Sequence, residues 1–209
     1  MTEQEKMLNG MIYDPNDKEL ATMRRYAHKL CSRYNRLDED DEKRAEILDM
    51  LVPQHNGVYL QGPIFFDYGE FISFGKNCYA NFNFTVLDCA PVTIGDDVYF
   101  GPNVSIVPPM HPFLPQERNQ YQREDGVMTD REYAKPVTVG SNCWIASNVV
   151  ICGGVTVGEG SVIGAGSVVT KDIPNGVLAA GNPCRVIRQI TEQDSVYLKK
   201  QLWEKNCAQ

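Results

Sequence analysis

Apolar residues recur every six positions through much of the chain after residue 58. Glycine or alanine often follows the apolar residue, and a small or β-branched residue often stands four positions after it. A period of six fits neither an α-helix nor an isolated strand, but it fits a solenoid whose flat sides are single short strands. The register comprises Phe74, Ala80 and Val86, then, after a step of eight residues, Ile94, Phe100 and Ile106, and later Val139, Ile145, Ile151, Val157, Ile163 and Val169.

The period also predicts the geometry of the solenoid. Three strands form a triangular coil, and each periodic side chain points to its centre. The glycine or alanine that follows lies near a corner, where a larger side chain crowds the bend. Each coil pairs its backbone with the coils above and below, so the stack builds one continuous core. We therefore predict a mainly β chain with a parallel β-helix over residues 58–190.

Two segments interrupt the period. Between Ile106 and Val139 it disappears, and prolines followed by many polar residues indicate a long loop at about residues 107–138, extruded from one corner. Long loops in compact domains are usually functional or disordered, so we expect this one to serve the site. The second interruption, residues 172–176, has the composition of a turn.

Both ends of the chain have helical patterns. Over residues 20–34, apolar side chains lie three or four positions apart and share one helical face. A second helix is predicted over Asp40–Leu51, ending before a proline. We expect an N-terminal helical segment over residues 1–57. At the other end we expect a C-terminal helix and tail over 191–209, with the helix running from Thr191 to Cys207.

Composition and charge narrow the function classes. The 209 residues carry a formal net charge of −7, which argues against nucleic acid or an acidic membrane surface as the partner. No apolar run approaches the roughly 20 residues that span a bilayer. The seven cysteines are scattered and include no C-x-x-C pair. We therefore expect reduced thiols in a cytoplasmic protein rather than a disulfide framework or a zinc site.

Several motifs resemble those of the hexapeptide-repeat sugar O-acetyltransferases, the maltose and galactoside acetyltransferase family. Many transferases share the repeat alone, so the N-terminal segment together with Asn81 and His111-Pro112 is the more specific part. The resemblance covers roughly residues 5–190. The matching stretches are Glu5-Lys6-Met7, Tyr13, Asn81-Phe82-Asn83, Thr93-Ile94-Gly95-Asp96, His111-Pro112, residues 135–140, Cys143-Trp144-Ile145, residues 164–174 and residues 180–187.

The resemblance implies a fold, an assembly and a reaction. The fold is a left-handed parallel β-helix, and its hand rests on the resemblance alone because it departs from the right-handed crossover rule. The assembly is a homotrimer with active sites between neighbouring prisms, and the N-terminal segment lies on the acceptor side. The implied reaction moves acetyl from acetyl-CoA to a hydroxyl of a small-molecule acceptor, a sugar or a sugar-like compound, and requires no metal.

Acyl transfer to a hydroxyl needs a base, and histidine, whose ordinary pKa is about 6.5, suits that role. The chain has three histidines. His28 is expected on the surface of the first long helix, and His55 in a linker without a role. The resemblance implies His111, at the start of the long loop, as the general base. It also implies Asn81 as a catalytic and acceptor-binding residue.

Other acceptor contacts are expected from polar groups that bind sugar hydroxyls. The resemblance implies Asp67, and it implies Asp14 and Arg24 as N-terminal contacts to the sugar. The alignment leaves open whether Arg24 or Arg25 faces the acceptor, and an ion pair on the helix surface is the alternative. Cys89 stands where the galactoside enzymes have an acidic residue, so the sequence does not favour a galactoside acceptor.

Acetyl-CoA needs cations for its phosphates and a groove for its pantetheine arm. Arginine offers bidentate phosphate contacts and lysine a point charge. In the family, a backbone N–H at the position of Ser147 stabilises the oxyanion, although a structural serine at a turn is the alternative. Trp144 is expected beside the thioester, with packing as its alternative. The residues implied for acetyl-CoA are Trp144, Ser147, Ala165, Thr170, Lys171, Arg185 and Arg188.

Three other functions compete with this interpretation. A γ-type carbonic anhydrase has the same fold but needs three histidine ligands, whereas only one histidine lies within the repeats. A non-catalytic β-helix would not need His111, Asn81 and Lys171 together. An acetyltransferase for a non-sugar alcohol or xenobiotic stays open, and the sugar-type N-terminal segment argues against it.

Overall fold

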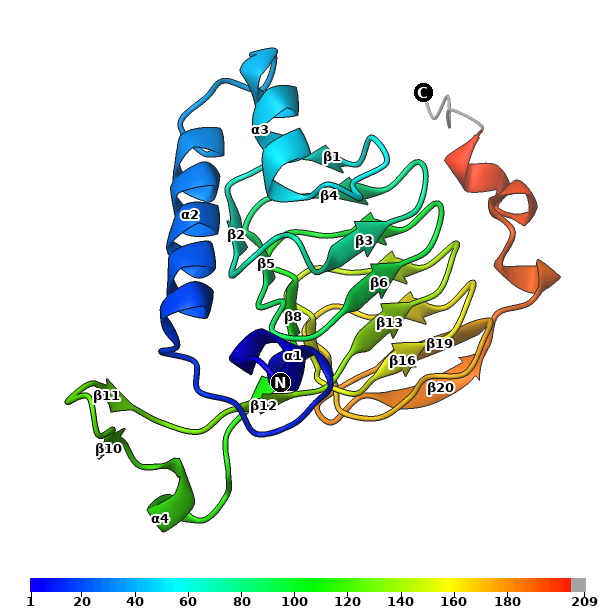
Figure 1. Cartoon of the computed structure of the whole chain (residues 1–209). Helices are drawn as coiled ribbons and strands as arrows, with labels where there is room; N and C mark the ends of the chain where they lie inside the picture. Colours follow the sequence, from blue (N-terminus) through cyan, green and yellow to red (C-terminus); the bar gives the residue numbers. More distant parts are fainter. Residues whose placement is uncertain (204–209) are drawn as a thin grey trace.

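The computed structural model describes residues 1–203, and its centre is a stack of triangular coils (Figure 1). Three sheets form the sides of the prism, and their strands pair in parallel from coil to coil. The first face consists of β1 (Tyr59–Leu60), β4 (Tyr79–Ala80), β7 (Tyr99–Phe100), β14 (Trp144–Ile145), β17 (Val162–Ile163) and β19 (Val177–Ala180), and is closed by antiparallel β20 (Arg185–Gln189). The second face consists of β2 (Ile64–Phe66), β5 (Phe84–Val86), β8 (Ser105–Val107), β15 (Val150–Cys152) and β18 (Val168–Val169). The third face consists of β3 (Ile72–Phe74), β6 (Val92–Ile94), β13 (Val137–Val139) and β16 (Thr156–Val157).

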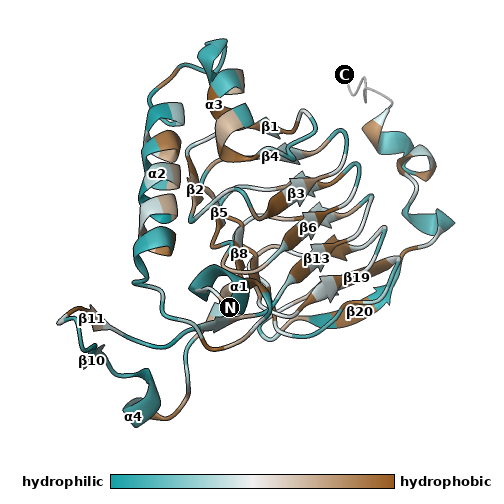
Figure 2. Ribbon diagram, viewed as in Figure 1, coloured by the Kyte–Doolittle hydropathy of each residue, from teal (hydrophilic) through white to brown (hydrophobic). Residues whose placement is uncertain are grey.

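The predicted six-residue register forms the core of the prism. Its side chains, from Phe74 to Val169, are 0–3% exposed, which confirms the inward direction of every position in the register. Phe66, Phe84 and Phe100 pack against one another in the interior, with ring centroids 6.0 and 4.8 Å apart. Figure 2 shows the same segregation, with hydrophobic strands and hydrophilic turns. Burial of these apolar side chains is the main favourable contribution to folding.

The prediction of crowded corners is confirmed, and the crowding comes from the next coil. A Cβ on Gly95 would lie 2.5 Å from the backbone nitrogen of Ser141. A second corner uses asparagine, which tolerates the left-handed backbone region. Asn83, Asn103 and Asn148 have φ values of 59°, 60° and 59°. Their amides form a ladder with N···O distances of 2.8 and 3.1 Å, so this corner is tied from coil to coil.

Three helices precede the coils: α1 (Glu3–Leu8), α2 (Lys18–Tyr34) and α3 (Lys43–Leu51). The Asp17 side chain caps α2 by accepting from the N–H groups of Glu19 and Leu20, and the predicted apolar face packs α2 along β2 (Figure 1). Helix α3 begins after the predicted Asp40, because the Asp41 side chain accepts from the Lys43 N–H at its start. Among residues 1–203, no helix has the length and apolar character that crossing a bilayer demands.

The long loop leaves the prism as predicted, but it has structure of its own. At its base, β9 (Pro109–Met110) pairs antiparallel with β12 (Tyr133–Ala134). Beyond this base lie α4 (Pro115–Arg118) and a hairpin of β10 (Tyr121–Gln122) and β11 (Met128–Thr129), which project away from the coils (Figure 1). The backbone pairing between β9 and β12 fixes the positions of the residues that flank these two strands.

The predicted C-terminal α-helix is wrong for the part of it that the structure describes. Residues 191–203 form three short 3₁₀ turns, η1 (Glu192–Asp194), η2 (Val196–Leu198) and η3 (Lys200–Leu202). Local side-chain bonds favour these turns: Ser195 accepts from the Tyr197 N–H, and Trp203 Nε1 donates to the Val196 carbonyl. Such bonds compete with the helical ladder. The rest of the predicted helix, to Cys207, lies outside the described residues.

Candidate active site

Between residues 60 and 179, the departures from the six-residue period all fall at the corner between the second and third faces. In the first two coils this corner contains extra residues, because eight positions separate Phe66 from Phe74 and Val86 from Ile94. In the next coil the long loop leaves from the same corner, between β8 and β13. We call this column the loop corner. Several of its side chains, Tyr68, Cys89 and Ala90, are buried in a second apolar cluster that they share with the N-terminal segment.

A pocket of about 500 Å³ lies at the loop corner, between the N-terminal segment and the base of the loop. It brings together three of the residues predicted for catalysis and acceptor binding: Arg24, Asp67 and His111. Its walls are otherwise polar on the loop side and apolar on the side of the coils. The full lining is Pro15, Asn16, Arg24, His28, Asp67, Leu87, Cys89, Val107, Pro109, His111, Asp130 and Glu132.

His111 stands between two carboxylates that sequence reasoning did not identify. Its Nδ1 lies 3.3 Å from the Arg131 carbonyl oxygen and 3.5 Å from Asp130 Oδ2. Its Nε2 lies 3.6 Å from Glu132 Oε1. A carbonyl oxygen only accepts hydrogen bonds, so the Arg131 contact favours the neutral tautomer with its proton on Nδ1 and its lone pair on Nε2. In that tautomer Nε2 is the nitrogen able to accept a proton.

Glu132 is held by the N-terminal segment. Its Oε2 accepts from the Tyr13 hydroxyl at 2.6 Å, and the two backbones exchange hydrogen bonds in an antiparallel bridge. Tyr13 is 2% exposed and belongs to a small apolar cluster that includes Met7 and Leu20. Burial raises the pKa of the Glu132 carboxyl above its ordinary value. The first helices thus position a loop residue beside the predicted base.

The expectation for His28 was incomplete. It does lie on α2 with a half-exposed side chain, but it lines the pocket, and its Nε2 lies 3.2 Å from Asp67 Oδ1. Helical periodicity placed it on the surface and could not show that the surface faces the loop corner. His55 instead pairs with Asp49 at 2.7 Å, near the end of α3, and does not line the pocket.

The two arginines differ in their relation to the pocket. Arg24 lines the pocket and donates from Nη1 to the Pro15 carbonyl and the Tyr68 hydroxyl, at 3.1 and 3.2 Å. Arg25 is exposed and donates to Thr22 on its own helix. Cys89 is buried at the pocket wall, and burial raises the pKa of its thiol. Among the lining residues within the described part of the chain, Arg24 is the one permanent cation, and it lies on the α2 side.

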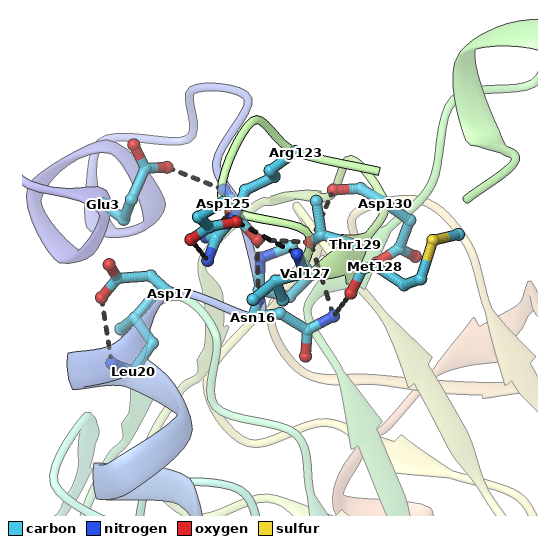
Figure 3. A network of polar contacts seen from close by, with 12 residues as sticks. Glu3, Asn16, Asp17, Leu20, Arg123, Asp125, Val127, Met128, Thr129 and Asp130 are labelled. Carbon is cyan, nitrogen blue, oxygen red and sulfur yellow. Dashed lines mark hydrogen bonds and ion pairs between the residues drawn. The ribbon is translucent and has the colours of Figure 1, made fainter. Parts of the chain in front are cut away.

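Asp14 is not brought to the pocket wall. Its carboxylate accepts from the Thr129 hydroxyl, from Arg123 Nη1 at 2.5 Å and from the Asn16 N–H at 2.9 Å. Arg123 also pairs with Asp125 at 2.7 Å within the hairpin (Figure 3). Partial burial tends to raise the pKa of Asp14, but the bonds from Thr129, Arg123 and Asn16 outweigh it and hold this pKa below its ordinary value. They also tie the β10–β11 hairpin to the N-terminal segment. In this structure Asp14 holds the loop, and its neighbours Pro15 and Asn16 line the pocket.

Asn81 and the residues predicted for acetyl-CoA lie outside this pocket. Asn81 and Ser147 belong to the corner between the first and second faces. The second face separates that corner from the loop corner, and six residues of extended strand span roughly 20 Å. The predicted residues occupy three places: Trp144, Ser147 and Ala165 on or beside the first face, Thr170 and Lys171 after β18, and Arg185 and Arg188 on β20.

The cations predicted to bind the phosphates differ in the partners that they already have. Lys171 is exposed, and Arg185 is exposed with one contact to the Cys184 carbonyl. Arg188 is already paired, because its guanidinium holds both oxygens of Asp194 at 2.6 and 2.7 Å. This pair also raises the pKa of Arg188. Lys171 and Arg185 are therefore the better candidates for a phosphate.

Among residues 1–203, one group of side chains has the spacing of a cation site. His111, Asp130 and Glu132 each offer a ligand atom, and these atoms lie within 4.8 Å of one another. Imidazole and carboxylates suit several divalent metals. A metal bound there through Nε2 would occupy the lone pair of His111, so it would compete with the role of this residue as a base.

Asp88 is a fully buried carboxyl beneath the loop corner. It is 0% exposed and accepts from the N–H groups of Tyr68 and Phe71 at 2.9 and 3.3 Å. Burial raises its pKa from 3.8 to about 7. Because the pKa of Asp88 is higher in the folded than in the unfolded chain, Asp88 contributes fully to the stability of the fold at pH values below 3.8. This contribution is lost as the pH rises through about 7.

We therefore expect the difference in Tm between Asp88→Asn and the wild type to shift in favour of the variant between about pH 4 and pH 8, because the amide cannot ionise. Thermal melting monitored by circular dichroism measures this. Asp40→Asn, at an exposed carboxylate, should run parallel to the wild type. A parallel curve for Asp88→Asn would show that Asp88 does not change its protonation in this range.

Comparisons with known proteins agree with the geometry. Residues 6–56 match the maltose acetyltransferase hexapeptide capping motif, and residues 136–171 match the bacterial transferase hexapeptide. The galactoside O-acetyltransferase of Escherichia coli K12 is 40% identical over 198 residues, which cover 94% of this chain and 93% of that protein.

Solved structures give the same result. The maltose O-acetyltransferase of Clostridium difficile 630 is 43% identical, with a TM-score of 0.83, and the match covers 92% of this chain and 99% of that one. A hexapeptide-repeat acetyltransferase of Vibrio cholerae, solved with acetyl-CoA, is 32% identical with a TM-score of 0.79, over 92% of this chain and 100% of that one. The coils, the capping helices and the similarity along nearly the whole chain show that this protein is an acetyltransferase belonging to the hexapeptide-repeat family of maltose and galactoside O-acetyltransferases.

Proposed function

We propose that the protein transfers acetyl from acetyl-CoA to a hydroxyl of a sugar acceptor bound in the loop-corner pocket, with His111 as the general base. The observation that carries this proposal is the position of His111 in the pocket, where the Arg131 carbonyl favours a proton on Nδ1 and leaves Nε2 free to accept one. The family to which the chain belongs supports the acetyl donor and the class of reaction.

The reaction follows from this arrangement. Nε2 of His111 takes the proton of the acceptor hydroxyl as the oxygen forms a bond to the acetyl carbon. The tetrahedral oxyanion then collapses, the carbon–sulfur bond breaks, and the CoA thiolate takes the proton from Nε2. A donor must stabilise the oxyanion, and we assign that role to the backbone N–H at Ser147, with Asn81 close to the reacting groups. The mechanism needs no acetylated enzyme.

The acceptor pocket suits a compound with several hydroxyl groups. Asp67, Asp130 and Glu132 offer carboxylate oxygens that accept from hydroxyls, and Arg24 offers donors. Maltose and galactoside acetyltransferases among the relatives support a sugar. A non-sugar alcohol is the alternative, and the apolar side chains of Leu87 and Val107 in the pocket would suit it.

The acetyl-CoA site is assigned to the exposed cations and the first face. Thr170, Lys171 and Arg185 would hold the phosphates, with Arg188 joining them once it leaves Asp194. Trp144 and Ala165 would border the pantetheine arm, and both are exposed. The proposal requires no metal, and it places the reaction in the cytoplasm, in line with the scattered cysteines.

A homotrimer would unite residues that one chain keeps apart. His111 and Asn81 lie at different corners of the prism, so for both to act in one site a neighbouring copy would bring its Asn81 corner to the pocket. We expect light scattering to give about three chain masses at micromolar concentration, since soluble homo-oligomers form closed symmetric assemblies. A monomer with full activity would contradict the shared site.

Mixing two inactive variants tests the shared site more sharply. His111→Ala and Asn81→Ala should each have little activity alone. The two variants are unfolded and refolded together in equal amounts. About a quarter of the sites should then contain an intact His111 from one copy and an intact Asn81 from another, and these sites should recover activity. His111→Ala mixed with itself is the control. Mixtures no more active than the separate variants would show that one chain supplies both residues.

An acceptor screen tests the function itself. Thiol release from acetyl-CoA should depend on the acceptor and should be fastest with monosaccharides, disaccharides or their glycosides. Simple alcohols without a sugar ring form the comparison set. Faster release with these alcohols than with any sugar would favour the non-sugar alternative, and no release with either set would contradict the proposed reaction.

A further inference from the structure

Contacts with Tyr13 hold both the side chain and the backbone of Glu132 in place. Its side chain is 19% exposed, its Oε2 accepts from the buried Tyr13 hydroxyl at 2.6 Å, and its backbone is paired with that of Tyr13. These contacts join residues that are 119 positions apart in the chain. They leave one oxygen, Oε1, directed at Nε2 of His111. Burying a carboxylate costs free energy of folding unless hydrogen bonds or an opposite charge compensate it.

We propose that Glu132, held by Tyr13, is a positioning residue that orients His111 and stabilises the imidazolium formed when Nε2 takes the acceptor proton. The inference rests on the proposed function. Before the transfer, Nε2 and Oε1 are both acceptors 3.6 Å apart, and the acceptor hydroxyl can donate between them. After the transfer, the new N–H faces a carboxylate, and this attraction exists only when the proton has moved.

The other charges around His111 do not replace this role. Asp130 faces Nδ1, which the Arg131 carbonyl already engages, so loss of Asp130 leaves a partner for that nitrogen. Asp67 and His28 pair with each other across the pocket. Arg24 is cationic and opposes formation of an imidazolium, and Tyr13 and Cys89 are buried neutral groups. Among these groups, Glu132 is the carboxylate directed at the nitrogen that receives the proton.

Glu132→Gln tests the charge with almost no change of shape. We expect kcat to fall on the order of 10- to 100-fold, with the KM for acetyl-CoA within about twofold of wild type, because the lost interaction forms mainly in the transition state. The acidic limb of the kcat/KM profile should move to lower pH, since a positive charge at Nε2 loses its partner. Glu132→Asp should recover part of the rate. Thermal melting establishes that each variant is folded.

Two further variants test the contribution of the Tyr13 hydroxyl and the specificity of the effect for Glu132. Tyr13→Phe keeps the buried ring and removes the hydroxyl, so kcat should fall by a smaller factor, about 3- to 10-fold, in the same direction. Asp130→Asn, the matched control on the other side of the ring, should reduce kcat less than Glu132→Gln.

The outcomes distinguish this inference from the proposed function. If His111→Ala is inactive while Glu132→Gln keeps wild-type kcat and an unchanged acidic limb, the role of Glu132 is overturned and the proposed function stands. Equal losses in Asp130→Asn and Glu132→Gln, without a shift of the limb, would also overturn it. If His111→Ala retains wild-type activity, the proposed function itself fails.

Discussion

His111→Ala should lower kcat on the order of 10² to 10⁴-fold while leaving the KM for acetyl-CoA nearly unchanged. General-base catalysis is typically worth that much, and the variant removes the base without touching the acetyl-CoA residues. The half-exposed side chain packs little apolar surface, so the fold should persist. Steady-state kinetics on the best acceptor, with thiol release as the readout, measures the effect.

The pH dependence supplies an independent check on the same residue. In the wild type, kcat/KM should fall at acidic pH, because a protonated imidazole cannot accept the hydroxyl proton. His111→Ala should lose this acidic limb together with most of the rate. His55→Ala is a suitable control, since His55 pairs with Asp49 away from the pocket. If His111→Ala keeps more than about a tenth of the wild-type turnover, another group is the base.

The double variant Lys171→Ala with Arg185→Ala should weaken binding of acetyl-CoA by about 2 to 4 kcal/mol, because each charged contact to a phosphate is worth about 1 to 2 kcal/mol. Both side chains are exposed and neither belongs to the core, so the melting temperature should change little. Isothermal titration calorimetry with CoA measures the affinity, and the loss should appear in the Kd rather than in the acceptor KM.

The matched control for this pair is Arg36→Ala with Lys43→Ala. These side chains are also exposed cations: Lys43 is the first residue of α3, and Arg36 lies between α2 and α3. Helix α3 is at the opposite end of the stack from β20 (Figure 1). Their loss changes the net charge equally and should leave CoA affinity unchanged. An equal weakening in both double variants would indicate a general charge effect, and unchanged affinity in Lys171→Ala with Arg185→Ala would show that the phosphates bind elsewhere.

The prism was predictable because its determinants are local and repeated. Each side chain of the register from Phe74 to Val169 is buried in the interior of the prism, so the period alone identifies the core. The glycines that follow, such as Gly95, mark where the next coil approaches. The C-terminal helix failed for a local reason too: bonds such as that from Trp203 Nε1 to the Val196 carbonyl favour short turns over a helical ladder.

The candidate site was predictable only in part. The resemblance supplied His111, Arg24 and Asp67, and the structure brings these three into one pocket. Glu132 and its partner Tyr13 could not be paired from the sequence, because a contact across 119 positions has no periodic signal. Asp14 shows the converse, since its carboxylate is engaged by a hairpin whose fold the sequence did not predict.

A single-turnover experiment can show whether acetyl passes directly from acetyl-CoA to the acceptor hydroxyl. The enzyme is mixed with a limiting amount of isotopically labelled acetyl-CoA, first without and then with the best acceptor. NMR identifies the labelled product, and intact-protein mass spectrometry monitors the chain. We expect one acetyl ester on an acceptor oxygen for each CoA released, with no acetylated protein before the acceptor is added. An acetyl adduct that forms on the enzyme and then passes to the acceptor, or an amide as the product, would contradict it.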